Sequence, residues 1–166
     1  MDVKIISHRG NLNGPNKKTE NTVKQIDFVL NEDFDCEIDV WLINEKLYLG
    51  HDNPENEITL NWLDMHKQSL WIHCKNFEAL NFFKNLDSTF NYFWHQKDDF
   101  TLTSKGYIWT YPEQKYDKNS VIVKLDNKLP KNLDLHGVCT DFVTEMSKSL
   151  ACIKIFCNYI FSESIW

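Results

Sequence analysis

The sequence predicts an α/β fold: a compact or reduced TIM-like (β/α)8 barrel in which some helices of the second half are shortened or missing. In the first half of the chain, short strand-like runs alternate with helical segments, as in parallel βα units. Between residues 91 and 124, strand-like runs follow one another with room only for a turn. Eight full βα units usually need ~250 residues, whereas this chain has 166. Helices on that side of the barrel are therefore expected to be thin or absent.

The spacing of apolar residues places the elements along the chain. Short runs rich in β-branched and aromatic residues predict strands at residues 3–6, 36–43, 46–49, 70–74, 90–94, 107–110, 121–125 and 137–140. Helices are predicted at about residues 19–31, 59–67, 77–85 and 145–160. In the first helix, Val23, Ile26 and Val29 recur with helical spacing, and Thr19 or Asn21 is the expected N-cap.

The composition predicts a single domain that spans residues 1–166. The chain is 42% hydrophobic and contains eleven Phe, six Trp and six Tyr, which is enough to bury one sizeable core. The formal net charge is -6, and lysines are interspersed with acids along the chain. A nucleic-acid partner is therefore not expected. A local cluster of cations could still bind a small anionic substrate.

The chain start and the cysteines predict a cytoplasmic protein. The first ten residues enter a strand directly, with an acid at position two and no long apolar run, so neither a signal peptide nor a membrane-inserted segment is expected. The apolar stretch at 150–161 is too short and too interrupted to cross a bilayer. The five cysteines (36, 74, 139, 152 and 157) form no CxxC pair, which favours buried thiols in a reducing compartment.

Glu37 and Asp39 are the strongest signal for chemistry. They are two residues apart in a strand-like run, so both side chains leave the same face of one strand. Two carboxylates this close need a cation between them, which can be a divalent metal, an Arg or a Lys. The alternative without a functional role is that both side chains lie on the solvent-exposed face of an edge strand.

Further polar residues follow the predicted strands, and in a βα barrel the carboxyl ends of the strands meet at one face. His8 and Arg9 close the first strand, and His51 follows Gly50 after the hairpin. Later strand ends carry His73, Lys75, His95, Gln96 and Asp141.

Several of these residues also have a structural interpretation. His73 is equally compatible with a core histidine and with a ligand, and Lys75 with a phosphate contact and with solvation of a helix entry. Asp52 could either orient His51 or cap the turn. His66 and His136 are expected to be structural, and Trp94, Trp109 and Tyr111 are more often core residues than a substrate platform.

Several of these motifs together resemble one known family. HRGN at 8–11, Gly14-Pro15, TENT at 19–22, EIDVW at 37–41 and LYLGHD at 47–52 are similar to the glycerophosphodiester phosphodiesterases, within the wider group of phospholipase-C-like phosphodiesterase barrels. WIHCKN at 71–76 and GVCTD at 137–141 follow in plausible register. The resemblance is dense over residues 5–52 and thinner beyond, and the chain is shorter than family members usually are.

The resemblance implies a role for each matching residue. His8 and His51 would be the acid/base pair, Arg9 and Lys75 would hold the phosphate, and Glu37 and Asp39 would bind Mg²⁺ or Ca²⁺. Glu20 would support Arg9, although TENT also suits a helix cap. The family's third metal ligand is an acid two residues before the lysine, and this chain has His73 there. That departure could weaken Mg²⁺ or Ca²⁺ and admit Mn²⁺ or Zn²⁺.

The chemistry of phosphodiester cleavage needs the same set of groups. Charge on the phosphoryl oxygens must be neutralised, one group must take a proton from the nucleophile, and another must give one to the leaving alkoxide. The expected function is thus a metal-dependent phosphodiesterase that hydrolyses a glycerophosphodiester or a related small or lipid-derived phosphodiester. Either water or a neighbouring substrate hydroxyl could be the nucleophile. The alternative function is a catalytically weak barrel that binds a phosphorylated ligand.

Overall fold

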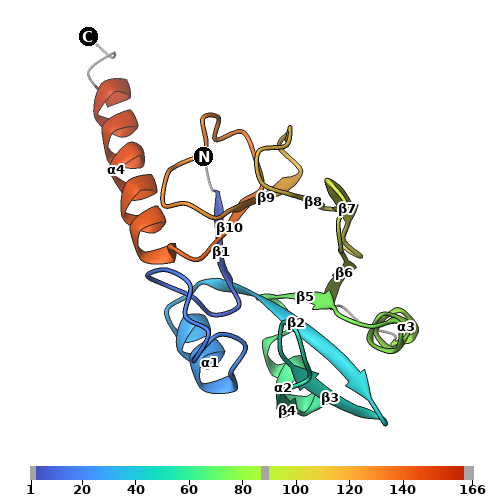
Figure 1. The fold of residues 1–166 in the computed structure, drawn as a ribbon. Coiled ribbons are helices and arrows are strands. Elements are labelled where there is room, and N and C mark those ends of the chain that lie inside the picture. The colour runs from blue at the N-terminus through green and yellow to red at the C-terminus, as the bar shows by residue number, and fades with distance from the viewer. Residues whose placement is uncertain (1–2, 87–89, 163–166) are drawn as a thin grey trace.

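The computed structural model describes residues 3–86 and 90–162 and shows a curled, mixed sheet, in the form of a half-barrel, flanked by four helices (Figure 1). The strands are β1 (Lys4–His8), β2 (Asp35–Ile43), β3 (Lys46–Leu49), β4 (Asn56–Ile58), β5 (Leu70–Cys74), β6 (Asn91–Trp94), β7 (Phe100–Leu102), β8 (Ile108–Thr110), β9 (Ser120–Lys124) and β10 (Gly137–Thr140). The helices are α1 (Val23–Asn31), α2 (Leu60–His66), α3 (Phe77–Asn85) and α4 (Val143–Ser162). The predicted α/β class and the loss of helices between the later strands are confirmed, but the prediction of a (β/α)8 barrel is wrong because the sheet does not close.

The sheet topology explains why the barrel stays open. Neighbouring strands run parallel in the order β6, β5, β2, β1, β10, β9 and β8. The next strand, β7, has three residues and pairs antiparallel with β8, so it takes the place of an eighth parallel strand. Within the described residues no strand ladder joins β7 to β6. Instead, the Ser104 amide donates to the Tyr92 carbonyl at 2.8 Å, and the Thr101 hydroxyl of β7 donates to the Trp94 carbonyl of β6 at 2.8 Å.

The helices begin at polar caps, as the sequence predicts, but the first cap is a different residue. Thr22 caps α1, where its hydroxyl accepts from the amide of Gln25, so the expected cap at Thr19 or Asn21 is wrong. Asn21 has a φ of 53°, outside helical geometry, and its side chain binds Asp39 instead. The helices then cover only part of the sheet. In Figure 1, α1, α2 and α3 lie outside the curve near β2 and β5, and α4 flanks β1 and β10.

Successive side chains of a strand point to opposite faces of the sheet, so one apolar layer faces the helices and another faces the inside of the curl. On β5, Leu70 and Ile72 face the helices and join the larger core. The intervening Trp71 points into the curl, where it packs with a layer made of Ile6, Phe93, Trp109, Val121 and Cys139. Because Glu37 is the register partner of Trp71 and Asp39 of His73, these polar residues extend the inner layer toward the carboxyl ends of the strands. The inner apolar layer therefore forms the floor beneath them.

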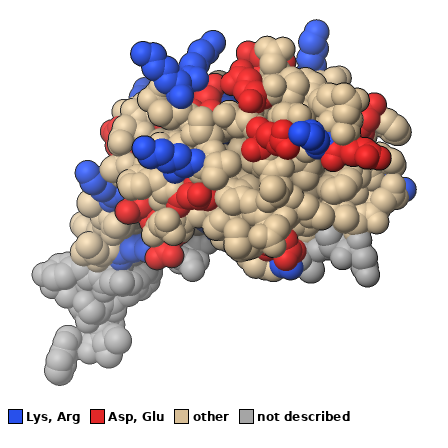
Figure 2. All heavy atoms as spheres, turned by 90° about the horizontal axis from the view of Figure 1, so that it is seen from below, with Lys and Arg blue, Asp and Glu red and all other residues tan. Residues whose placement is uncertain are grey.

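Three cysteines, Cys36, Cys74 and Cys139, are buried free thiols, as predicted, whereas Cys152 is exposed. The side chain of Cys157 lies outside the described residues. Basic and acidic side chains intermix on the face of the molecule seen in Figure 2. In the part of the chain that the structure describes, no helix is both long enough and apolar enough to cross a membrane.

Candidate active site

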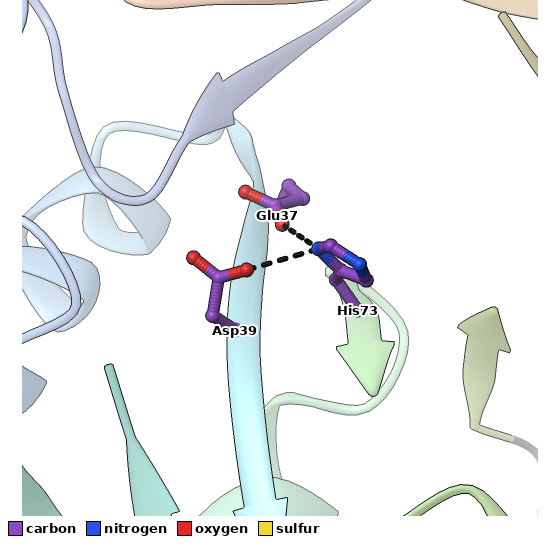
Figure 3. A group of neighbouring side chains, drawn as sticks. All are labelled: Glu37, Asp39 and His73. Atoms are coloured by element: carbon purple, nitrogen blue, oxygen red, sulfur yellow. Dashed lines mark ion pairs between the residues drawn. The ribbon is translucent and has the colours of Figure 1, made fainter. Parts of the chain in front are cut away.

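Two carboxylates and an imidazole form a compact group on β2 and β5 (Figure 3). Glu37 and Asp39 leave the same face of β2, and His73 lies opposite Asp39 on β5. His73 Nδ1 is 2.9 Å from Asp39 Oδ1 and 3.7 Å from Glu37 Oε1. One ligand atom from each of the three residues lies within 4.8 Å of the other two. This mostly buried group could hold a metal ion.

Asp39 is completely buried and is surrounded by positive and hydrogen-donating groups. Arg9 Nε lies 3.1 Å from its Oδ2, Lys75 Nζ lies 3.2 Å from its Oδ1, and Asn21 Nδ2 donates to Oδ2 at 2.9 Å. Burial alone would raise the pKa of Asp39, but His73, Lys75 and Arg9 outweigh burial and lower it. Asp39 is therefore held as a carboxylate.

Glu37 is the less satisfied of the two acids. Among the described residues, its buried Oε2 atom has no hydrogen-bond partner and, unlike Asp39 Oδ1, takes part in no ion pair. Burial, and next the charge of Asp39, raise the pKa of Glu37, although His8 and His73 oppose this. A buried carboxylate oxygen without a partner is unfavourable, and a bound cation would satisfy it. Two carboxylates and one imidazole nitrogen are a suitable ligand set for a divalent cation.

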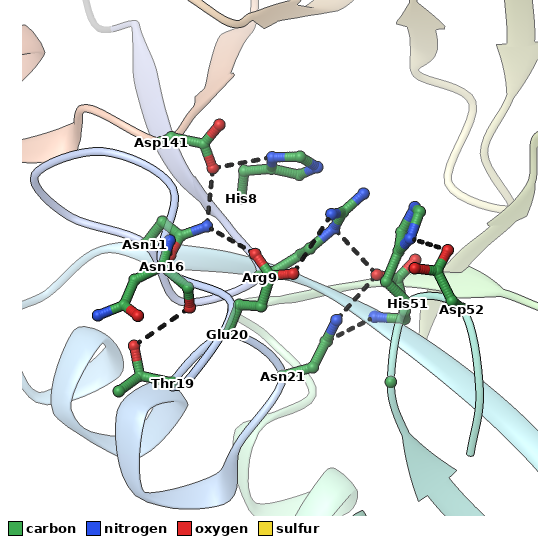
Figure 4. A network of polar contacts seen from close by, with 12 residues as sticks. His8, Arg9, Asn11, Asn16, Thr19, Glu20, Asn21, His51, Asp52 and Asp141 are labelled. Carbon is green, nitrogen blue, oxygen red and sulfur yellow. Dashed lines mark hydrogen bonds and ion pairs between the residues drawn. The ribbon is translucent and has the colours of Figure 1, made fainter. Parts of the chain in front are cut away.

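His8 is the last residue of β1 and is fixed by a residue from the far end of the chain. Its Nδ1 donates to Asp141 Oδ1 at 3.0 Å, and the same oxygen accepts from Asn11 Nδ2 at 2.8 Å (Figure 4). Burial by itself lowers the pKa of His8, but the Asp141 hydrogen bond and the charge of Glu37 outweigh burial and raise it. Asp141 follows β10, which pairs with β1, so the sheet brings the two residues together.

His51 is placed by the tight turn that follows β3. Gly50 has a φ of 149°, and a Cβ there would lie 2.0 Å from the carbonyl oxygen of Asn53. Trp41 Nε1 donates to the Gly50 carbonyl at 2.6 Å and fixes the start of this turn. His51 Nδ1 donates to Asp52 Oδ1 at 2.7 Å. Burial is the main cause that lowers the pKa of His51.

The two imidazoles share one arrangement and differ in environment. Each presents Nδ1 to a carboxylate, so each keeps Nε2 for another partner, and no described residue hydrogen-bonds to either Nε2. The carboxylate partner of His8 is buried, whereas the Asp52 side chain is 76% exposed. The pKa of His8 is raised and that of His51 is lowered. Environments that separate two pKa values in this way are typical of an acid and base pair.

One cavity of about 430 Å³ collects these groups. Its polar wall is formed by His8, Arg9, Glu37, His51, His73 and Lys75, and the predicted strand-end residues His95 and Gln96 also line the cavity. Its aromatic wall consists of Trp94, Trp109, Tyr111, Pro112, Val123 and Leu125. Asp39 lies beneath the polar wall. The cavity combines charges, proton-transfer groups and an apolar surface, which is the composition of a small-molecule site.

Other predicted residues lie beside or away from the cavity. Glu20 Oε1 is 3.8 Å from Arg9 Nη1 and so supports Arg9 from the side. His66, the last residue of α2, lies near Asp27 of α1. His136 stacks on Tyr107, with ring centroids 4.1 Å apart. Neither histidine lines the cavity.

Sequence reasoning missed the two amides that organise the site, Asn11 and Asn21. Asn11 joins Asp141 to Glu20, and Asn21 makes two hydrogen bonds with Asp39. The available signal was weak: asparagine tolerates a left-handed backbone conformation, which Asn21 adopts.

Comparisons of the chain with protein-family models, curated proteins and solved structures gave no match.

Proposed function

We propose that this chain is a metal-dependent phosphodiesterase that hydrolyses a glycerophosphodiester or a related small or lipid-derived phosphodiester. The observation that carries the proposal is the convergence of His8, His51, Arg9 and Lys75 on one cavity next to the Glu37/Asp39/His73 group. The motifs at residues 8–52 that resemble the glycerophosphodiester phosphodiesterases also support it, because they contain His8, Arg9, Glu37, Asp39 and His51.

The residues divide the work of the reaction between them. Glu37, Asp39 and His73 would hold a divalent cation, which supplies positive charge next to the phosphoryl oxygens. Arg9 and Lys75 reach the cavity while contacting Asp39, so their charges lie where the phosphate would bind. Both groups stabilise the extra negative charge that develops on phosphorus-bound oxygens in the transition state.

The two imidazoles would move the protons. His51, whose pKa is lowered, takes a proton on Nε2 from the nucleophile, which is water or a substrate hydroxyl beside the phosphate. A new P–O bond forms and the bond to the leaving alcohol breaks. His8, whose pKa is raised, gives a proton from Nε2 to the departing alkoxide. Asp52 and Asp141 keep the two rings in the required tautomer.

The test is turnover by the metal-stripped full chain after addition of Mg²⁺, Ca²⁺, Mn²⁺ or Zn²⁺. Release of alcohol from glycerophosphocholine, or of nitrophenol from a chromogenic diester, is expected with at least one metal. The His8→Gln/His51→Gln double variant should be inactive, whereas His66→Gln, which lies outside the cavity, should match the unmodified chain. Folded protein without turnover on either kind of diester under every metal would refute the proposal.

A second candidate function is binding of a phosphorylated ligand without turnover. The observation that favours it is the set of groups that already contact Asp39, because its single negative charge faces the cations Arg9 and Lys75 as well as His73 and Asn21. Calorimetric titration with glycerol phosphate separates the two functions. Tight binding that is unchanged in His8→Ala and His51→Ala, without product from any diester, would favour the binder.

A further inference from the structure

We propose that His73 makes the Glu37/Asp39/His73 centre selective for a divalent transition metal, with Mn²⁺ and Zn²⁺ preferred over Mg²⁺ and Ca²⁺, and that Nδ1 is the ligand atom. The inference rests on the proposed function, because it specifies the cation of that same site. It is carried by the orientation of the His73 ring.

The hydrogen bond on the far side of the ring decides which nitrogen faces the carboxylates. His73 Nε2 lies 2.8 Å from the backbone carbonyl of His95. A carbonyl only accepts, so Nε2 carries the hydrogen. Nδ1 then points at the two carboxylates, 2.9 Å from Asp39 and 3.7 Å from Glu37. A histidine ligand whose other nitrogen donates to a backbone carbonyl is the usual arrangement in metal centres.

The ring is also held rigidly in that orientation. It stacks on Phe93, with ring centroids 5.2 Å apart and planes 3° apart. Phe93 is the register partner of His73 on the neighbouring strand β6 and is itself buried. The side chain of His73 is only 12% exposed. A ligand fixed by stacking and by a hydrogen bond is preorganised, so little entropy is lost when a cation binds.

The chemistry of this ligand set determines the selectivity. Mg²⁺ and Ca²⁺ are hard cations that take oxygen ligands, so a nitrogen in place of a third carboxylate removes both an oxygen and a negative charge. Arg9 and Lys75, which contact Asp39, weaken the electrostatic attraction for any divalent cation, so the bond from His73 Nδ1 contributes a larger share of the affinity. Imidazole nitrogen instead suits Zn²⁺ and the other later transition metals. Mn²⁺ stands at the weak end of that series, but as a transition metal it accepts an imidazole ligand more readily than Mg²⁺ or Ca²⁺ does.

The first measurement is calorimetric titration of the metal-stripped full chain with each of the four cations. We expect Mn²⁺ to bind about 100-fold more tightly than Mg²⁺. His73→Asp places a carboxylate oxygen the same number of bonds from the backbone as Nδ1, so the Mn²⁺-to-Mg²⁺ affinity ratio should fall by about tenfold or more. His73→Asn should weaken Mn²⁺ without a gain in Mg²⁺. His66→Asn is the matched histidine control and should leave all four affinities unchanged.

The second measurement needs no substitution at the site. Pulsed electron paramagnetic resonance of Mn²⁺ bound to chain labelled with ¹⁵N at histidine Nδ1 should show coupling to a directly bonded nitrogen. Absence of that coupling, or an unchanged Mn²⁺-to-Mg²⁺ ratio in His73→Asp, would overturn the inference. If the same preparation still cleaves diesters with a metal, the phosphodiesterase proposal survives that failure. Metal bound through His73 without cleavage of any diester would support the metal assignment and count against the enzyme.

Discussion

The two walls of the cavity are built on different parts of the sheet. The polar wall comes from β1, β2, β5 and the turn after β3, where α1, α2 and α3 pack behind β2 and β5, and α4 contacts β1. The aromatic wall comes from β6, β8, β9 and the segments that follow them, and among the described residues no helix lies between β6 and β10 in the chain. The half whose strands alternate with helices along the chain thus carries the proton-transfer and metal-binding groups, while the half whose strands follow one another without helices mainly shapes the cavity.

The walls also differ in how firmly their side chains are held. Glu37 and Asp39 are buried, and Arg9, Asn21 and His73 contact them directly. On the aromatic wall, Trp109 is buried, but Tyr111 is 49% exposed and Leu125 is 56% exposed. Substitutions should therefore affect chemistry on the polar wall and substrate fit on the aromatic wall.

The largest effect is expected within the polar wall, where proton transfer and metal binding can be separated. His51→Ala should lower kcat by about 10²- to 10⁴-fold, because a proton-transfer group is lost, and should leave metal affinity nearly intact. Glu37→Gln should lose both turnover and metal binding, because an anionic ligand is removed. Kinetics and calorimetric metal titration on both variants check this. Equal loss of metal affinity in the two variants would contradict the assigned roles.

The next effect concerns the turn that positions His51. Gly50→Ala would place a Cβ 2.0 Å from the Asn53 carbonyl oxygen and push the turn away from the cavity. A displacement of about 1 Å should lower kcat/KM by about 10²-fold. Gly106→Ala is the matched control, since Gly106 also has a positive φ, of 85°, but a Cβ added there would meet no atom within 4 Å. Similar losses of activity in both variants would mean that strain, rather than the position of His51, is responsible.

Asp141 allows the environment of His8 to be changed without touching the ring. Asp141→Asn removes the charge that raises the pKa of His8, so that pKa should fall. If His8 acts as the acid, activity is lost as the pH rises through its pKa, and the basic limb of the pH–rate profile should move to lower pH. The rate at the optimum should fall by about 10- to 100-fold. Titration of His8 by NMR checks the shift directly.

The control for Asp141 is Asp52, the carboxylate partner of the other imidazole. Asp52 is largely exposed, so solvent can replace its hydrogen bond to His51. Asp52→Asn should therefore change the profile less than Asp141→Asn does. A basic limb that stays in place in Asp141→Asn would argue against His8 as the acid.

The polar wall could be predicted from sequence because its main signals are local. Alternation along one strand puts Glu37 and Asp39 on one face, and parallel strands bring His8 and His73 to the same end of the sheet. The partner of His8 was harder to assign, since the sequence places Asp141 at a strand end without indicating what it contacts. The contact between Asn21 and Asp39 was missed because it depends on how the loop after β1 folds back onto β2.

The open side of the barrel could not be predicted for a different reason. β7 (Phe100–Leu102) is three residues long and pairs antiparallel with β8. This direction follows from the short connection between the two strands, and the spacing of apolar residues carries no signal for it. Strand propensity indicates that such a segment is extended, but it does not indicate its direction or partner. The length of the chain correctly indicated missing helices and left open whether the sheet would still close.

The smallest effect is expected on the aromatic wall, at Tyr111. Tyr111→Ala removes an aromatic ring at the rim of the cavity, so KM for a chromogenic diester with aromatic groups should rise by about 2- to 10-fold. The KM for glycerophosphoglycerol, which has no apolar group, should change little, and kcat and metal affinity should stay the same. Leu102→Ala is the control, because Leu102 is similarly exposed but does not line the cavity. The kcat of Tyr111→Ala could instead fall as far as that of the polar-wall variants. That result would show that the polar wall is not alone responsible for catalysis and that the aromatic wall does more than bind substrate.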